Sequence, residues 1–214
     1  FDASSLFLHD RFTGLDRYEG GTRVNAGLLY TFLSQNGGFL RASFGESYHV
    51  AGENSFADDS GLEGTSSDLV AAIAWQPWDS VRLSYQARFE EDLSDINVQE
   101  AALGLNFDRI SGSISYASLD ADPHVDREER EEQIWGSFGW NFTGGWSVYA
   151  GARYDLAESK LLRDTIGIGY NCDCFNFRLF YEEDYADEDE KVDRSVLFSI
   201  DLKSLGGDDA VPSL

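Results

Sequence analysis

Apolar and polar residues alternate along most of this chain with a period of two. That is the period of a β-strand, whose successive side chains point to opposite faces. In residues 81–90 the odd positions are Val, Leu, Tyr, Ala and Phe, and the even positions are Arg, Ser, Gln, Arg and Glu. Residues 23–32 follow the same rule with Leu29 as the exception, and residues 146–155 follow it again. About twelve such segments of roughly 9 to 12 residues predict an all-β protein.

The connections between these segments alternate in length. Short turns are predicted at 35–38, 77–80, 108–111, 143–145 and 171–173. Longer, acidic connections are predicted at 11–20, 51–67, 91–95, 120–131 and 185–191. Only 157–160 is short where a long connection is due. An up-and-down arrangement with short turns at one end and long loops at the other is typical of transmembrane β-barrels.

Aromatic residues gather near the two ends of the predicted strands. Those near the short turns are Phe32, Trp75, Phe107, Trp140, Phe142, Trp146 and Tyr170. Those near the long loops are Tyr48, Phe89, Tyr116, Tyr154 and Tyr181. Aliphatic residues such as Ile73 and Leu105 lie between these two girdles. A soluble β-sandwich explains the alternation but not the girdles, so the pattern predicts a transmembrane antiparallel up-and-down β-barrel.

The opposite face of the strands is polar and carries seven arginines. These candidates for lining a lumen are Arg23, Arg41, Arg82, Arg88, Arg153, Arg163 and Arg178. By default, such residues are simply hydrated by the water that fills a lumen. The alternative is that they bind sugars and phosphates, because the planar guanidinium fork pairs well with phosphate.

The overall charge and the histidines exclude other classes of function. The chain has 39 acidic and 16 basic residues, a net charge of −23, which argues against nucleic-acid binding. His9, His49 and His124 show no metal-ligand spacing and no adjacent nucleophile, and an acid–base cluster of Asp58, Asp59 and His124 is a weak alternative. We therefore expect no enzyme, no metal and no cofactor.

We find no signal peptide and no apolar run that could form a transmembrane helix. A chain that begins at Phe1 without any Met reads as part of a longer protein.

Two cysteines, Cys172 and Cys174, lie one residue apart in a predicted short turn. Pairing them with each other would be strained, and an isolated pair does not complete a zinc site. Outer-membrane barrels place short turns in the periplasm, so this turn and the C-terminus are expected there, where thiols become oxidised. Two buried, unreactive thiols remain the alternative.

Two stretches resemble a known family. The first is "RFTGLDRYEGGTRVNAGLLY", and the second is "IGYNCDCFNFRLFY" followed by "VLFSIDLKSLGG". Both resemble segments of the LPS-assembly proteins of the LptD family. The first matches at Asp10, Arg11, Phe12, Gly14, Asp16, Arg17, Arg23, Gly27 and Tyr30.

The resemblance implies the C-terminal portion, residues 1–205, of an incomplete barrel in the outer membrane of a Gram-negative bacterium, followed by a periplasmic tail, 206–214. Such a barrel inserts lipopolysaccharide into the outer leaflet through a polar lumen and a lateral opening. The last strand would then be the lateral-gate strand, with Val196, Phe198, Ile200 and Leu202 on its lipid-facing side. The acidic loops 120–132 and 182–193 are either solvated or bind divalent cations that bridge lipopolysaccharide phosphates.

The resemblance also implies partners. Cys172 and Cys174 would form disulfides with cysteines near the mature N-terminus, which this chain lacks. The expected partners are lipopolysaccharide, outer-membrane lipid, a plug lipoprotein, and periplasmic jellyroll and bridge components.

A complete porin-like barrel of about twelve strands that passes small solutes is the alternative function. In that case a first strand near Ser5–His9 would pair with the last strand and leave no free edge. A piece of a larger barrel would instead be an open sheet or would close through a short, poor seam. We expect the second outcome.

Overall fold

The computed structural model of the chain describes residues 1–11, 18–57, 60–122, 127–185 and 192–203. Over these residues the chain forms eleven β-strands, one 3-10 turn and no α-helix. The elements are β1 (Thr22–Leu33), β2 (Phe39–Ala51), β3 (Leu69–Trp78), β4 (Val81–Phe89), β5 (Ile96–Asn106), β6 (Ile110–Leu119), β7 (Glu131–Asn141), η2 (Thr143–Gly145), β8 (Trp146–Asp155), β9 (Lys160–Asn171), β10 (Phe175–Asp184) and β11 (Asp193–Leu202).

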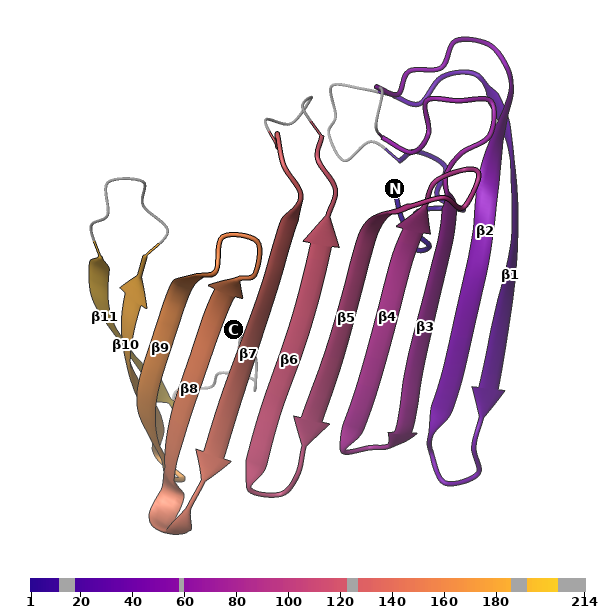
Figure 1. Cartoon of the computed structure of the whole chain (residues 1–214). Helices are drawn as coiled ribbons and strands as arrows, with labels where there is room; N and C mark the ends of the chain where they lie inside the picture. Colours follow the sequence, from indigo (N-terminus) through magenta and orange to yellow (C-terminus); the bar gives the residue numbers. More distant parts are fainter. Residues whose placement is uncertain (12–17, 58–59, 123–126, 186–191, 204–214) are drawn as a thin grey trace. The chain divides into compact units, whose positions relative to one another are not determined.

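The hydrogen-bonded order of the strands follows the sequence from β1 to β11, and neighbouring strands are antiparallel (Figure 1). Short connections join β1 to β2, β3 to β4 and β9 to β10, whereas residues 52–68 make the long connection from β2 to β3. The predicted all-β, up-and-down class is confirmed. The order is linear, with β1 and β11 as its two ends, so the prediction of an open rather than a closed sheet is confirmed as well.

The prediction of a first strand near Ser5–His9 is wrong. Residues 3–7 form a turn, in which the Leu8 N–H donates to the Ser5 carbonyl at 3.1 Å. The Asp2 carboxylate accepts from the backbone N–H groups of Ser4 and Ser5 at 2.8 Å each. This local capping competes with an extended conformation, as Asp and Ser side chains do at turns. The first strand begins only at Thr22.

The described part of the chain divides into two compact units, Phe1–Gly104 with Ser115–Gln133, and Leu105–Ile114 with Ile134–Leu214. In the first unit, strand register places whole rows of side chains on one face. Leu28, Phe44, Ala71 and Ala87 form one such row, and Tyr30, Ala42, Ile73 and Tyr85 form the next. We call this the apolar face. The row nearest the short turns is Phe32, Leu40, Trp75 and Leu83.

The second unit has the same division into an apolar and a polar face. Val148, Ile168, Leu179 and Phe198 form a row of its apolar face, and Trp146, Tyr170, Phe177 and Ile200 form the row nearest the short turns. The rings of Trp146 and Tyr170 lie 4.9 Å apart, centroid to centroid. The aromatic residues of these strands therefore adjoin across the sheet.

Most large apolar side chains of the described residues are solvent-exposed rather than packed in a core. Leu28 is 66% exposed, Ile166 62% and Phe198 72%. The only buried hydrophobic residues among those described are Leu6, Leu62, Val70 and Ala87. Because burial of apolar side chains is the main favourable term in folding in water, this chain needs another apolar environment for its apolar face.

The polar face of the second unit contains one aromatic pair. Tyr149 of β8 and Phe180 of β10 both lie opposite Gly167 of β9, and their rings are 5.5 Å apart. A β-carbon added at Gly167 would clash with the Phe180 ring. Glycine at position 167 therefore provides the space that the Phe180 ring occupies.

We predict that Gly167→Ala lowers the free energy of unfolding by about 1–3 kcal/mol, because the added methyl group overpacks the Phe180 ring. Gly151→Ala is the matched control on the same face of β8, since its nearest neighbour, the Gly136 carbonyl oxygen, lies at 3.5 Å. Urea unfolding in detergent micelles measures both variants. Equal losses would contradict the packing described for Phe180.

Candidate functional site

Two exposed arginines lie on the polar face of the first unit, toward the short turns. Arg41 of β2 lies opposite Thr31 and Ala74. Arg82 of β4 donates from Nε and Nη2 to the Gln76 side-chain oxygen, at 3.2 and 3.0 Å. This half of the face therefore presents two accessible cations.

The third arginine of this face, Arg88, lies toward the long loops and is ion-paired. Its Nε is 3.2 Å from the Asp68 carboxylate, and its Nη1 donates to the Ser60 carbonyl at 2.8 Å. Asn97 of β5 also donates to Asp68, at 3.0 Å. Burial raises the pKa of Asp68, although the hydrogen bond from Asn97 and the charge of Arg88 oppose that rise. Arg88 thus connects β4 to the 52–68 connection instead of lining an open space alone.

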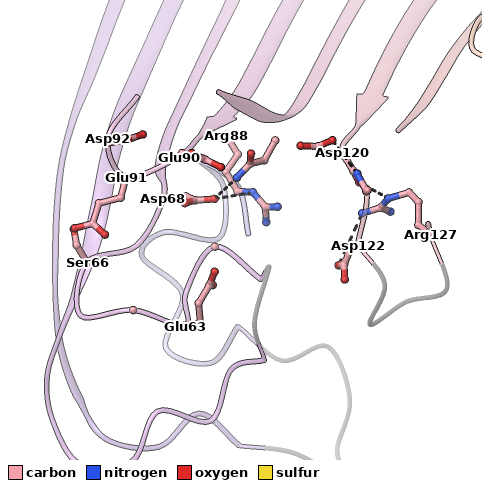
Figure 2. A pocket seen from close by; sticks show the side chains of 14 residues that line it. Glu63, Ser66, Asp68, Arg88, Glu90, Glu91, Asp92, Asp120, Asp122 and Arg127 are labelled. Carbon is pink, nitrogen blue, oxygen red and sulfur yellow. Dashed lines mark hydrogen bonds and ion pairs between the residues drawn. The ribbon is translucent and has the colours of Figure 1, made fainter. Parts of the chain in front are cut away.

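These groups form part of a polar cavity of about 630 Å³ at the loop end of the first unit (Figure 2). On its opposite side, Arg127 donates from Nε to the Asp120 carbonyl at 2.6 Å and lies 3.9 Å from the Asp122 carboxylate. The carboxylate-bearing lining residues are Glu63, Asp68, Glu90, Glu91, Asp92, Asp120 and Asp122. Because seven carboxylates face two arginines, the cavity suits hydroxyl-rich groups better than phosphate. Asp68 was not among the predicted site residues, although it stands directly before a strand and in phase with the polar face.

Arg23, another predicted lumen residue, lies against the N-terminal segment of the chain. Its Nη2 donates to the carbonyl of Leu8 at 2.5 Å and to that of His9 at 2.9 Å. It also forms an ion pair with Glu19, whose side chain is 3% exposed. Glu19 was not among the predicted site residues, because a lone acidic residue in an acidic loop carries no signal in the sequence.

Two predicted arginines of the second unit contact carboxylates on its polar face. Arg163 of β9 contacts Asp184 at 2.5 Å, and Arg178 of β10 contacts Asp201 at 3.7 Å. Arg153 of β8 lies directly opposite Arg163 in the register. The sequence had shown neither of these pairs, because each partner lies on a neighbouring strand.

The predicted lateral-gate strand is β11, the last strand in the order, which pairs with β10. All four of its predicted residues are at least half exposed: Val196 66%, Phe198 72%, Ile200 56% and Leu202 53%. Leu197, which faces the other side beside Phe180, is exposed as well. Among the described residues, the far side of β11 has no strand partner.

Both cysteines lie in the three-residue turn between β9 and β10, as predicted. They are free thiols, with Cys172 half-buried and Cys174 exposed. The Cys172 N–H donates to the Phe175 carbonyl at 3.0 Å, and the Lys203 N–H donates to the Cys174 carbonyl at 3.1 Å. Hydrogen bonds with the backbone of Phe175 and Cys174 lower the pKa of the Cys172 thiol, and the Lys203 charge acts in the same direction.

Some predicted features lie outside the described residues. These are Asp58, Asp59, His124, parts of both acidic loops, and the tail 206–214. Within the described ranges, no group of three or more His, Cys, Asp or Glu side chains is arranged to hold a metal ion. No helix in those ranges has the length and apolar character needed to cross a membrane.

The fold and the two faces define a class of protein. Antiparallel strands in sequential order, with one exposed apolar face and one polar face, are the wall of an up-and-down β-barrel. A family model described as LptD, LPS transport system D, matches residues 1–146 of the 214-residue chain. The chain belongs to the LptD family.

Curated relatives agree with this family along nearly the whole chain. The LPS-assembly protein LptD of Saccharophagus degradans is 27% identical over 240 residues, which cover 98% of this chain and 27% of the relative. The corresponding protein of Pseudomonas aeruginosa is 27% identical over 252 residues, with 97% of this chain and 26% of the relative covered. That of Nitrosomonas eutropha is 21% identical over 207 residues. The chain thus spans about a quarter of the length of these relatives.

We predict that Cys172 reacts with iodoacetamide as a thiolate at lower pH than an ordinary cysteine, whose pKa is about 8.5. A lowered pKa means that the reactive anion persists as the pH falls, so alkylation at pH 7 should be faster in the folded chain than in urea. The experiment uses the Cys174→Ser variant, in which Cys172 is the remaining thiol, and mass spectrometry measures its alkylation rate between pH 6 and 9. A folded-state midpoint at or above the unfolded one would contradict the prediction.

Proposed function

We propose that this chain is the C-terminal portion of the wall of an outer-membrane barrel that assembles lipopolysaccharide in the outer leaflet of a Gram-negative bacterium. The observation that carries the proposal is the exposed apolar face of both units in a chain that belongs to the LptD family. Its relatives are named LPS-assembly proteins, and lipopolysaccharide is a lipid with a large polar part. A wall with one apolar and one polar face suits both parts of such a molecule.

In this proposal the apolar face contacts hydrocarbon. The rows that contain Trp75 and Phe32, and Trp146 and Tyr170, lie next to the short turns and mark one membrane interface. By the usual orientation of such barrels, the short turns and the C-terminus are periplasmic and the long connections are extracellular. The tail 206–214 would then be periplasmic.

The polar face lines the lumen in this proposal. The exposed Arg41 and Arg82, on the half toward the short turns, would meet the phosphates of an anionic glycolipid that enters from the periplasm. The carboxylate-rich cavity beside Arg88 lies toward the extracellular loops, where hydroxyl-rich sugars would pass. Arg23, Arg163 and Arg178, which are already paired with carboxylates, would shape the wall.

The free edge of β11 and the two cysteines support the proposed lateral opening and the proposed disulfides. A free edge of β11 with exposed Val196, Phe198, Ile200 and Leu202 suits a seam that opens sideways to lipid. Cys172 and Cys174 would form disulfides with cysteines outside this chain, because both are free here and Cys174 is exposed. The proposed partners are a plug lipoprotein and periplasmic jellyroll and bridge components. A complete porin-like barrel fits less well, because the strand order is linear and Ser5–His9 is not a strand.

We predict that Ala71→Arg destabilises the protein in lipid vesicles by about 2–4 kcal/mol, the effect of a cation on the lipid-facing side near mid-membrane depth. Ala72→Arg is the matched control, because Ala72 lies on the polar face between Ser43 and Gln86 and its variant should be close to neutral. Urea unfolding in vesicles measures both. Equal destabilisation would show that the two faces do not meet different solvents.

We predict that replacing both Arg41 and Arg82 by Gln slows delivery of lipopolysaccharide to the cell surface several-fold, because two exposed phosphate contacts are lost at about 0.2–1 kcal/mol each. Arg109→Gln, in a short turn, is the control and should leave delivery unchanged. The measurement is the surface exposure of pulse-labelled lipopolysaccharide in cells that depend on the protein. If delivery is unaffected while the conductance for small ions changes, the porin alternative is favoured.

A further inference from the structure

The N-terminal segment Phe1–His9, which we call the strap, folds into its own turn. The Asp2 carboxylate accepts from the Ser4 hydroxyl at 2.7 Å as well as from two backbone N–H groups, and the Ser5 hydroxyl donates to the Asp2 carbonyl at 3.0 Å. The strap makes no ladder with β1. Its conformation is therefore set by local hydrogen bonds rather than by the sheet.

The strap packs Leu6 against the polar face of the first unit, and the Phe7 ring lies beside it near Gly27. Gly27 of β1 lies directly opposite Gly45 of β2, and Gly45 lies opposite Val70 of β3. Leu6 is only 2% exposed, and its Cδ2 lies 2.6 Å from the place where a β-carbon at Gly45 would stand and 3.1 Å from that at Gly27. The two glycines thus leave a hollow that Leu6 occupies. Val70, in the same row, is 0% exposed.

A buried ion-pair cluster fixes the end of the strap. Arg23 donates to the carbonyls of Leu8 and His9, and Glu19 lies between Arg23 and Arg11. The Arg11 side chain is 5% exposed, and its guanidinium carbon lies 5.3 Å from the ring centroids of both Phe1 and Phe56. Most of this cluster consists of charged groups that are removed from water, so each group depends on the other two.

We infer that the strap is a conformational device, a cover that closes the loop end of the polar face over β1–β3 and is fixed there by Arg23. No described strand pairs with it, and the Leu6 and Phe7 side chains and two backbone carbonyls make its contacts with β1 and β2. Displacing it would uncover Gly27, Gly45 and Val70 without breaking the sheet. The inference concerns this face alone and goes beyond the proposed transport of lipopolysaccharide.

The position of the strap is tested in the full-length protein by site-specific photo-crosslinking. A diazirine side chain of the size of leucine at position 6 should crosslink to peptides that contain Gly27 or Gly45, as read by mass spectrometry. The same group at position 8 is the control, because Leu8 is 51% exposed and should give little or no such product. The role of Arg23 is tested by Arg23→Gln, which should lower the yield from position 6 several-fold. An unchanged yield overturns that role, and absence of the product in the unsubstituted protein overturns the inference.

A second measurement tests the cover as a barrier. Leu6→Asp should raise single-channel conductance several-fold, and Leu8→Asp should leave it unchanged, in protein whose folding is verified by heat-modifiable mobility. Equal conductance in the two folded variants overturns the barrier role. If Leu6→Asp does not fold, conductance of the Arg23→Gln protein decides in its place. The crosslinking result does not depend on transport, so failure of the strap and failure of the proposed function give different outcomes.

Discussion

The structure depends on one constraint, which is that the apolar face of the strands has nothing within the described chain to pack against. Side chains such as Leu28, Ile166 and Phe198 are mostly exposed, while only four hydrophobic residues among those described are buried. In water this arrangement would lose the main driving force of folding. In hydrocarbon the exposed apolar side chains carry no such penalty, but every backbone N–H and C=O group must then find a hydrogen-bond partner in the sheet. The sequential antiparallel order satisfies this requirement for every strand except at the outer edges of β1 and β11.

The same constraint explains why the charged groups of the strands lie on the polar face. The charged groups of the strands lie on this face, and several of its arginines pair with carboxylates from neighbouring strands or loops. Arg88 with Asp68, Arg163 with Asp184 and Arg23 with Glu19 all follow this rule. Within the first unit, Arg41 and Arg82 differ from Arg88 in being exposed, on the half toward the short turns. The first unit therefore has cations at one end of its polar face and a carboxylate-rich cavity at the other.

Most of the strand pattern was predictable because the period of two and the turn residues are local properties of the chain. The predicted last strand, with Val196, Phe198, Ile200 and Leu202 on one side, is β11 (Asp193–Leu202), and the turn that bears Cys172 and Cys174 lies where the pattern predicted it. The failures have a tertiary cause. Residues 5–9 carry three consecutive apolar residues and were expected to form the first strand, but Asp2 caps a turn there and Leu6 is buried against two glycines that lie on strands farther along the chain. The ion-pair partners of the arginines could not be predicted from the sequence either, because the register of neighbouring strands brings them together.

The structure gives a physical reason for three of the residues that carry the family resemblance. Arg11, Arg23 and Gly27 are matched positions of the first motif, and in the structure they meet at one junction between the strap and the sheet. Gly27 is needed for space, because a β-carbon there would lie 2.9 Å from the Phe44 carbonyl oxygen and 3.1 Å from the side chains of Leu6 and Phe7. Arg23 stands at the start of β1, where its guanidinium group reaches both the carboxylate of Glu19 and the end of the strap. These three matched positions, which look scattered in the sequence, therefore contribute to one contact region between the strap and the polar face, beside the hollow that Gly27 and Gly45 leave.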